Sequence, residues 1–413
     1  MPTTTGKLYL GSTLLCGGGG GCEWVRPSDW LPLPAAQPDS VKILHAVFDQ
    51  FENFAALRMI TSTGNYQVDW GDGTVDIVAS NAIAEHNYDF ANPALNGTLT
   101  SRGYKQAIIV VTPVSGNFSY AYLNARPLSP ANLQTYGSGF LDININLPNL
   151  TPAGVLAIGS GSVRHLHLER ANISSWGNIT TLSSLFVNCF SLQSVNETEW
   201  DLSNITSIQN IFQGCGMLKS LDCRNWDLSS CNNAISAFSG CSSLSEILIP
   251  ATSFAANANL NNMFTSCNSL IELDMSALDV SNVTNMSSMF NRCWSMRTIN
   301  ITGWNTSSVT DVNNMFVFCY ALQKIPTLNF GSATNFTAFV TNCNSLVSMK
   351  ATGISKNVSF ASCLLGASAL DEIYTNLADL TSLPAQTITV TGNYGTATDN
   401  PAIATAKNWI VVG

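Results

Sequence analysis

The sequence predicts an α/β solenoid of 26-residue coils with a parallel sheet along one side, preceded by an all-β sandwich. Three observations predict this fold. A Phe-x-x-Cys motif recurs every 26 residues, each of its cysteines is followed by an apolar-x-x-apolar step, and an earlier segment alternates around a Trp-Gly-Asp-Gly turn. A coil of this size cannot bury its apolar face alone, so equivalent coils must stack on one another.

The repeated motif defines columns of side chains that we expect to be buried. The apolar-x-x-apolar step indicates a short strand, and "VTNMSSMFNRC" indicates a short helix or 3₁₀ turn on the opposite side of the coil. Stacked strands lie about 4.8 Å apart, so equivalent side chains form continuous ladders. The predicted ladder consists of Phe186, Cys189, Phe212, Cys215, Phe238, Cys241, Phe264, Cys267, Phe290, Cys293, Phe316 and Cys319, with degenerate copies at Val340, Cys343, Phe360 and Cys363.

Composition limits the classes of function. Of the 413 residues 46% are hydrophobic and only 10% are charged, whereas about a quarter are charged in an average soluble protein. The net charge of -9 and the lack of a Lys/Arg run argue against nucleic acid and anionic membranes as partners. The start lacks the basic and long apolar segments of a signal peptide, and no apolar run approaches the ~20 residues that span a bilayer. We therefore expect a chain made in the cytoplasm with reduced thiols.

Changes in composition and residue pattern along the sequence predict five parts. Three prolines and several aromatic residues mark a connector between the sandwich and the solenoid. The parts are an N-terminal anchor or tether at 1–40, the β-sandwich at 41–115, the connector at 116–150, the solenoid at 151–383 and a C-terminal cap at 384–413.

The cysteines of the repeats are predicted to be structural. A catalytic nucleophile is needed once per site and beside a histidine, whereas these thiols recur in every coil. Zinc is disfavoured by the lack of paired C-x-x-C spacing, and disulfides are disfavoured by the reducing compartment and by sheet geometry. All four histidines precede the regular repeats: His45, His86, His165 and His167. We therefore predict a protein that is not an enzyme, with no catalytic residue, cofactor or metal site.

Two groups of residues before the repeats could hold a metal ion. Asp69, Asp72 and Asp76 surround the Trp-Gly-Asp-Gly turn, but the alternating oxygen ligands ending in Glu that bind calcium are absent. A turn with polar capping is therefore favoured over a calcium site. His165 and His167 share one face of a predicted strand, where a capping strand with exposed polar groups is favoured over a two-histidine site.

The N-terminal part is predicted to attach the chain to a larger assembly. Five glycines separate Cys16 from Cys22, and a glycine run loses much backbone entropy on ordering. The segment is a flexible tether, a disulfide-closed loop or a stretch that orders only against a partner, and these alternatives stay open beside that of a disordered leader. Trp24 and Trp30, flanked by prolines, are the candidate docking side chains.

Residues that alternate with buried strand positions are predicted to point outward and bind a partner. Their hydroxyl, amide and carboxylate groups suit hydrogen bonding to glycans, and solenoid faces often bind partners. Plain solvation is the alternative for any one of them. The candidates are Ser220, Asp222, Arg224, Glu272, Asp274, Ser276, Thr298, Asn300 and Thr302. The Asn-x-Ser/Thr sequons follow from the repeat itself and are not interpreted as glycosylation sites.

The repeat "MFNRCWSMRTINITGWNTSSVTDVNNMF" resembles the BspA-like leucine-rich repeats of bacterial surface antigens, over about residues 150 to 413. This resemblance implies a leucine-rich-repeat-like solenoid and a role in surface adhesion or interaction. The turn in "YQVDWGDGTVDIV" with its later His-x-Tyr resembles the Ig-like β-sandwich of the polycystic-kidney-disease (PKD) type, over about residues 41 to 115, which implies a spacer. "KLYLGSTLL" is similar to short N-terminal stretches of phage structural proteins.

These observations predict a non-enzymatic phage virion protein of tail-fibre or adhesin type, made in the host cytoplasm. Its N-terminus is expected to bind other virion proteins, and its solenoid is expected to bind a host-surface glycan or protein. A capsid-decorating protein without a receptor and a bacterial cell-surface adhesin are the alternatives. Homo-oligomerisation stays open, because the sequence has no coiled-coil heptad to enforce it.

Overall fold

The computed structural model of the chain describes residues 24–49, 53–125, 139–159 and 167–413. The chain divides into two compact units. We call residues 1–150, 162–177 and 191–195 the N-terminal unit, and residues 151–161, 178–190 and 196–413 the solenoid unit. Short segments after residue 150 therefore alternate between the two units.

The N-terminal unit contains a seven-stranded sheet in the order β11-β10-β8-β1-β6-β3-β4. Ile43 of β1 lies opposite Ile109 of β6 and Ile143 of β8 in antiparallel pairs, whereas β10 joins β8 in parallel. These three isoleucines are fully buried, so apolar side chains hold the centre of the sheet. The strands are β1 (Ser40–Val47), β3 (Tyr66–Asp69), β4 (Val75–Val78), β6 (Lys105–Pro113), β8 (Phe140–Asn146), β10 (Arg170–Ser175) and β11 (Ser194–Val195).

Three further strands of this unit pair antiparallel in the order β5-β2-β7. They are β2 (Phe54–Thr61), β5 (Ile83–Asn87) and β7 (Phe118–Tyr122), and a 3₁₀ turn, η1 (Pro93–Leu95), follows β5. The Trp-Gly-Asp-Gly turn joins β3 to β4 as a hairpin, and the Trp70 amide donates to the carbonyl oxygen of Thr74 at 3.1 Å. Gly71 and Gly73 have positive φ values of 76° and 93°, which explains the two glycines of this turn.

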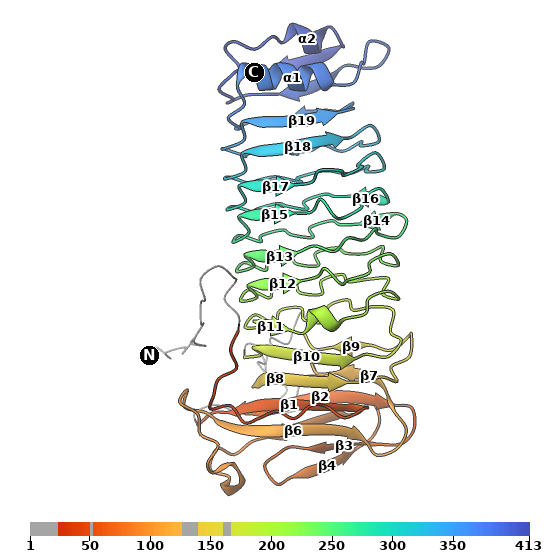
Figure 1. Cartoon of the computed structure of the whole chain (residues 1–413), viewed down its shortest axis with the longest axis vertical. Helices are drawn as coiled ribbons and strands as arrows, with labels where there is room; N and C mark the ends of the chain where they lie inside the picture. The colour runs from red at the N-terminus through yellow and green to blue at the C-terminus, as the bar shows by residue number, and fades with distance from the viewer. Residues whose placement is uncertain (1–23, 50–52, 126–138, 160–166) are drawn as a thin grey trace. The chain divides into compact units, whose positions relative to one another are not determined.

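The solenoid unit stacks its coils so that short parallel strands lie one above another (Figure 1). Leu221 lies opposite Ile247 and Leu273 lies opposite Ile299, so equivalent residues of adjacent coils pair. The predicted stack of 26-residue coils is therefore confirmed. The strands on this side are β12 (Ser220–Asp222), β13 (Glu246–Leu248), β15 (Glu272–Asp274), β17 (Thr298–Asn300), β18 (Lys324–Asn329) and β19 (Ser348–Thr352).

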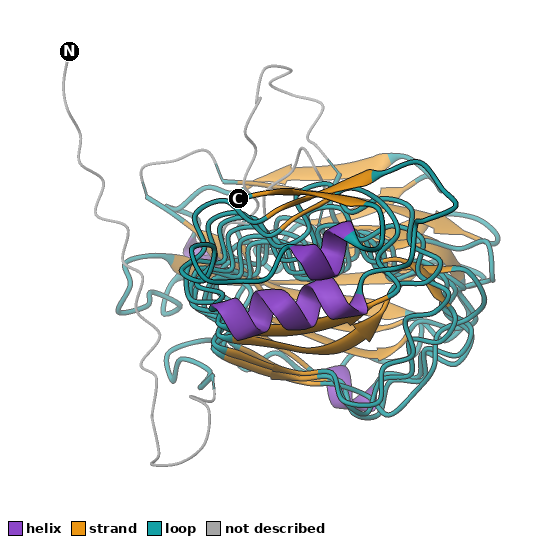
Figure 2. Cartoon of the chain, turned by 90° about the horizontal axis from the view of Figure 1, so that it is seen from above, coloured by secondary structure: helices purple, strands orange, loops and turns teal. Residues whose placement is uncertain are grey.

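A second line of backbone pairing follows another side of the coils. β14 (Ala258–Asn259) pairs with β16 (Val283–Asn285), and single bridges join further coils, such as Ser207 to Asn233. Figure 2 shows the loops of successive coils superposed in the view along the stack. The unit also contains β9 (Leu156–Ala157), the 3₁₀ turn η2 (Glu197–Glu199) and a C-terminal group of β20 (Val358–Ser359), α1 (Ala367–Asn376), β21 (Gln386–Thr389), α2 (Ala402–Thr405) and β22 (Trp409–Val412).

The predicted α/β class is wrong, because the repeats form a β-solenoid with little helix. The segment predicted as a short helix or 3₁₀ turn, residues 283–293, forms strand β16 followed by turns. Ser288 and Arg292 have φ values of 55° and 62°. A right-handed helix cannot pass through residues in this left-handed conformation. In the described part of the solenoid unit, α-helix is confined to α1 and α2 near the C-terminus.

The interior of the coils is a column of stacked phenylalanine rings. The ring centroids of Phe212, Phe238 and Phe264 lie 6.0 and 5.2 Å apart, and all three side chains are buried. Removing each such side chain from water contributes about 1.5–3 kcal/mol. Phe186, Phe290 and Phe316 continue the column. Because the column holds the coils in one register, it also fixes which residues face outward.

Candidate binding surface on the solenoid

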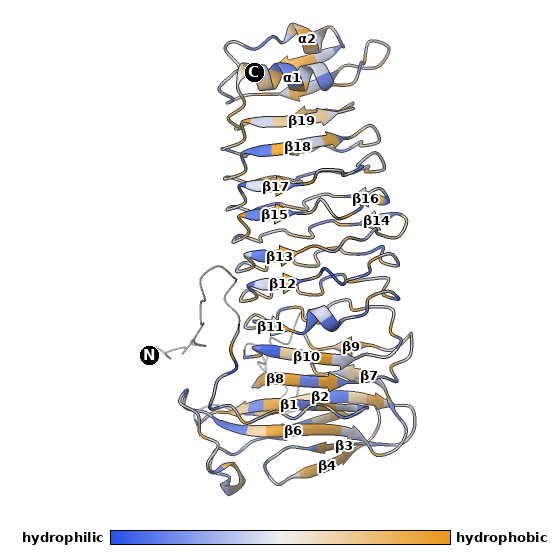
Figure 3. Cartoon of the chain, in the orientation of Figure 1, coloured by the Kyte–Doolittle hydropathy of each residue, from blue (hydrophilic) through white to orange (hydrophobic). Residues whose placement is uncertain are grey.

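The outer side of the parallel strands alternates exposed and buried residues. Glu272 and Asp274 of β15 are exposed around a buried Leu273, and β17 repeats the pattern with an exposed Thr298 and Asn300. Figure 3 shows that β13, β15 and β18 each begin with hydrophilic residues. We call this surface the strand face; it includes the predicted residues Ser220, Asp222, Arg224, Glu272, Asp274, Ser276, Thr298, Asn300 and Thr302, all exposed except the half-buried Asp222.

The register of β15 and β17 brings four of these side chains into pairs. Glu272 lies opposite Thr298, and Asp274 lies opposite Asn300. At the end of β15 the Asp274 carboxylate accepts hydrogen bonds from the Ser276 amide at 2.9 Å and from its hydroxyl at 2.7 Å. These hydrogen bonds hold the pKa of Asp274 below its ordinary 3.8, so the group is anionic at neutral pH. The strand face therefore presents fixed acceptors beside hydroxyl and amide groups.

The earlier coils present a different pair of strands. Ser220 and Asp222 of β12 lie opposite Glu246 and Leu248 of β13, two residues that the sequence analysis did not select. The guanidinium of Arg224 donates to the Asp222 carboxylate at 2.6 Å. Since the strands of this side form separate pairs, β12 with β13 and β15 with β17, the predicted residues divide into two groups on the strand face.

The thiols of the ladder are buried hydrogen-bond donors. The sulfur of Cys293 lies 3.2 Å from the carbonyl oxygen of Phe264 in the preceding coil. Burial raises the pKa of Cys293 to about 12, so at neutral pH it is a thiol and not a thiolate nucleophile. The ten described cysteines are free. The same bond to the preceding coil is made by Cys215, Cys241, Cys267, Cys319, Cys343 and Cys363.

The carboxylates around the Trp-Gly-Asp-Gly turn all have protein partners. Asp69 accepts from a backbone amide two residues later at 2.9 Å, and Asp76 accepts from the indole N–H of Trp70 at 2.8 Å. Asp72 lies 2.8 Å from Nε2 of His86. These contacts give each of the three carboxylates a partner within the protein and stabilise the hairpin.

The predicted histidine pair is described only at one member, because His165 lies outside the described residues. The ring of His167 lies 5.3 Å from that of Phe48, and burial lowers its pKa. Among the described residues, no three His, Cys, Asp or Glu side chains gather in an arrangement that could hold a metal ion.

The candidate docking residues near the N-terminus have different environments. Trp30 is buried, and its indole N–H donates to the hydroxyl of Tyr104 at 2.8 Å. Its ring is therefore not available to a partner, contrary to the docking role predicted for it. Trp24 is half-buried, and its indole N–H donates to Glu169 at 3.3 Å. Cys16 and Cys22 lie outside the described residues.

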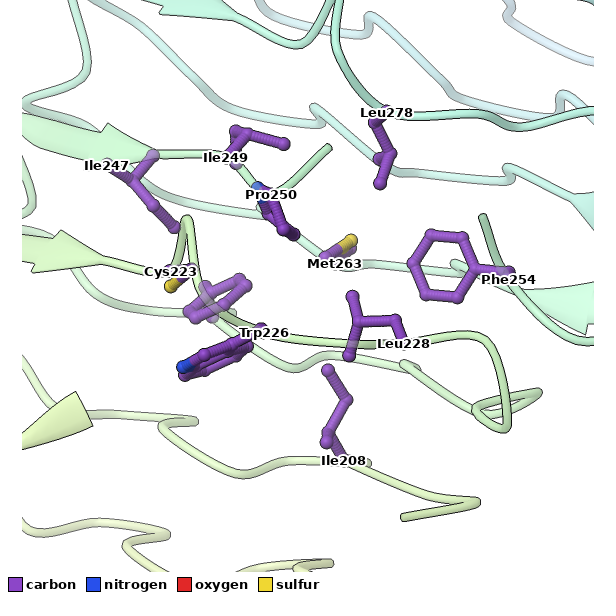
Figure 4. A pocket seen from close by; sticks show the side chains of 11 residues that line it. Ile208, Cys223, Trp226, Leu228, Ile247, Ile249, Pro250, Phe254, Met263 and Leu278 are labelled. Carbon is purple, nitrogen blue, oxygen red and sulfur yellow. The ribbon is translucent and has the colours of Figure 1, made fainter. Parts of the chain in front are cut away.

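A small hollow lies inside the solenoid unit, near the change from the β12–β13 pair to the β15–β17 pair. Apolar side chains line it, among them Trp226, Ile247, Pro250 and Leu278 (Figure 4). At the coil position of Trp226 the next coil holds the smaller Thr252. A binding site needs polar groups that orient a ligand, so this hollow is a gap in packing.

Two exposed aromatic residues of the solenoid unit were not predicted from the sequence. Trp294 is 48% exposed and Tyr320 is 41% exposed, at the same position of two adjacent coils. The equivalent positions of the three preceding coils hold Gly216, Ser242 and Asn268, and the coil before those holds an exposed Phe190. This break in the repeat was the signal, and it is visible once the coils are aligned.

Residues 163–268 and 252–352 match a family model described as "Mycoplasma protein of unknown function, DUF285". The match supports the predicted resemblance of these coils to the BspA-like repeat family. The PKD-type resemblance and the phage origin stay predictions. No curated protein matches the chain. In the part of the chain that the structure describes, none of the helices has the length and apolar character to cross a membrane.

Proposed function

We propose that this chain is a non-catalytic recognition protein of tail-fibre or adhesin type. In this proposal the strand face of the solenoid unit contacts a glycan or protein on a host cell, and the N-terminal residues attach the chain to other virion proteins. The setting is a phage virion.

The observation that carries the proposal is the strand face itself. Polar side chains such as Glu272 and Thr298 stand in fixed cross-strand register above a fully buried aromatic column. A rigid surface loses little conformational entropy on binding, which favours recognition. The thiol of Cys293 is buried and its raised pKa keeps it protonated at neutral pH, which favours a structural role for it over a catalytic one.

Two other settings share the same architecture. A capsid-decorating protein also needs an attachment segment and a stable projecting body, but it has no receptor. A bacterial cell-surface adhesin would use the strand face on another cell or on host tissue, as the resemblance of the coils to bacterial surface antigens implies.

The first experiment is electron microscopy of purified phage particles labelled with an antibody raised against the solenoid unit. Label at a tail tip or fibre is the expected result. Label over the head would replace the receptor-binding role with capsid decoration. Label on bacterial cells and on no particle would make the chain a cellular adhesin.

A second experiment tests recognition directly, with the full chain and cells that it binds. Glu272→Lys combined with Thr298→Lys places two cations on the strand face and should abolish binding to the cells. Ser308→Lys, at an exposed position away from the strands, is the matched control. Equal binding by both variants would contradict a role for the strand face, and depolymerisation of a polysaccharide by the purified chain would overturn the non-catalytic assignment.

A further inference from the structure

Two consecutive parts of the coil stack carry opposite charge. Residues 196–285 contain nine acidic and two basic side chains, a net charge of -7. Residues 286–357 contain one acidic side chain, Asp311, against five basic ones, a net charge of +4. The basic residues are Arg292, Arg297, Lys324, Lys350 and Lys356. In a chain with a net charge of -9, the later coils are therefore the place where an anionic ligand is attracted.

Two of these later coils have large side chains at a position whose left-handed backbone conformation favours glycine. Each coil has a left-handed residue just before the ladder cysteine, and the earlier coils use Gly214 and Gly240 there, with φ values of 76° and 77°. Arg292 and Phe318 occupy the same position with φ values of 62°. A left-handed phenylalanine is a strained outlier, and such strain is characteristic of functional sites.

The strained residues belong to one cluster on the surface. The guanidinium carbon of Arg292 lies 5.9 Å from the ring centroid of Phe318, and that ring lies 5.9 Å from the ring of Tyr320 at an angle of 53°. Trp294 holds the position of Tyr320 in the preceding coil of the stack. We call Arg292, Trp294, Phe318 and Tyr320 the aromatic corner.

We propose that the aromatic corner binds a polysaccharide segment that carries carboxylate groups. This proposal rests on the proposed recognition role of the solenoid unit and names its ligand class. Trp294 and Tyr320 are exposed on adjacent coils, and aromatic rings suit contact with the apolar C–H faces of sugar rings. The guanidinium of Arg292 can hold a carboxylate through two parallel hydrogen bonds. Neighbouring hydroxyl and amide side chains of the solenoid suit the sugar hydroxyls.

A single-stranded nucleic acid also stacks on aromatic side chains, but it needs a positively charged groove along its backbone. The aromatic corner holds one guanidinium, and the coils before it are strongly acidic. Because one guanidinium cannot neutralise a phosphate chain along its length, the aromatic corner favours a sugar chain that is held by aromatic contacts and one carboxylate.

The test measures binding of the full chain to polygalacturonate, to neutral dextran and to an oligothymidylate by calorimetry. Binding to polygalacturonate alone is the expected result. Tighter binding to oligothymidylate would make the ligand a nucleic acid, and equal binding to dextran would remove the role of the carboxylate; either result overturns the proposal. Binding to none of the three probes would also overturn it.

Each test variant takes the residue that another coil holds at the same position, so that the fold accepts it. Trp294→Asn copies Asn268, and it should weaken the affinity for polygalacturonate about tenfold, the ratio that corresponds to ~1.4 kcal/mol. Phe190→Asn changes an exposed aromatic residue at the same coil position outside the aromatic corner and is the matched control. Equal losses in the two variants would contradict the proposal.

Phe318→Gly separates binding from stability. It copies Gly240 and removes the strain, so the melting temperature should stay equal or rise while the affinity falls about tenfold. A purely structural role for Phe318 predicts the reverse, a lower melting temperature with unchanged affinity.

The outcome for the proposed function is read separately, on cells. If the aromatic-corner variants bind cells like the unchanged chain, this ligand site is wrong and the recognition role stands. If the unchanged chain binds polygalacturonate through the aromatic corner but binds no cell, the recognition role is wrong and the site stands.

Discussion

The thiol of Cys241 donates a hydrogen bond to the carbonyl oxygen of Phe212 in the preceding coil, with a sulfur–oxygen distance of 3.2 Å. The ring of the same Phe212 stacks on that of Phe238 at 6.0 Å. One motif thus attaches adjacent coils twice, through the backbone oxygen and through the ring. This double attachment explains why phenylalanine and cysteine recur together at a spacing of three residues.

Replacing a ladder thiol should loosen the attachment between two coils. Cys267→Ala removes a buried sulfur and its bond to Phe238, so we expect the free energy of unfolding to fall by about 1–2 kcal/mol. Urea denaturation followed by circular dichroism measures this change. Ser308→Ala, on the exposed surface, should alter stability by less than about 0.5 kcal/mol. A loss no larger in Cys267→Ala than in this control would exclude the thiol bond as a stabilising contact.

Alkaline pH should destabilise the protein through the same thiols. Burial raises the pKa of Cys241 from its ordinary 9.0 to about 12. The unfolded chain therefore loses this proton first, so the contribution to stability is complete below pH 9 and disappears as pH rises towards 12. Urea midpoints measured across this range should fall less steeply in Cys241→Ala than in the unchanged chain. Parallel curves would show that the thiol does not titrate as its burial requires.

Acid should unfold the N-terminal unit through His45. This fully buried ring stacks on Tyr88, with 4.7 Å between the ring centroids. Positive charge on His167 or His86 would repel a protonated His45. No described residue forms a hydrogen bond with its ring nitrogens. Burial lowers its pKa from 6.5 to about 3, so the unfolded chain binds the proton first as pH falls. The contribution to stability is therefore present above pH 6.5 and is lost towards pH 3, at up to about 1.4 kcal/mol per pH unit.

Tryptophan fluorescence during acid titration measures this loss, because Trp30 and Trp70 are buried in the N-terminal unit. His45→Phe removes the titrating group and should move the acid transition to lower pH. The matched control is His167→Phe, at a ring whose pKa is also lowered by burial. A larger shift in the control would assign the acid transition to His167.

The two glycines of the β3–β4 turn should respond differently to alanine. A Cβ at position 71 would overlap the backbone carbonyl and amide of Ile108, whereas a Cβ at position 73 would meet open space. Gly73→Ala should therefore cost about 1 kcal/mol from its left-handed conformation alone, and Gly71→Ala about 3 kcal/mol or more. Thermal denaturation of the two variants is the measurement. Equal costs would show that close approach to β6 does not explain Gly71.

Periodic features of the fold could be predicted from the sequence, because a period is a local signal. The spacing from Phe238 to Phe264 predicted the stacked column, and the Trp-Gly-Asp-Gly turn predicted the β3–β4 hairpin. The helix prediction failed because residues inside the predicted helix, such as Ser288 and Arg292, adopt a left-handed backbone conformation. Apolar periodicity does not distinguish these two outcomes.

The pairing of strands far apart in the sequence and the residues of the aromatic corner could not be predicted from the sequence. The pairing of β1 with β8 joins strands about a hundred residues apart, and no local pattern in either strand specifies its partner. On the candidate site, the exposure of Glu272 and Thr298 followed from alternation, but the contact of Arg292 with Phe318 depends on the φ values of both residues. The repeat motif identifies the residues that all coils share, whereas the residues of the aromatic corner differ from those at the same positions of most other coils.

Residues 196–285 and 286–357 carry opposite charge, which gives this part of the coil stack a permanent electric dipole along its axis, whereas residues 358–413, with four acidic side chains and one lysine, are acidic again. In the field of an anionic cell envelope this dipole experiences a torque that turns the later, basic coils toward the envelope before any contact forms. Orientation in advance raises the fraction of productive collisions, and added salt suppresses it. In the proposed recognition role, the placement of a few lysines and arginines would thus set the rate of association without changing any contact in the final complex.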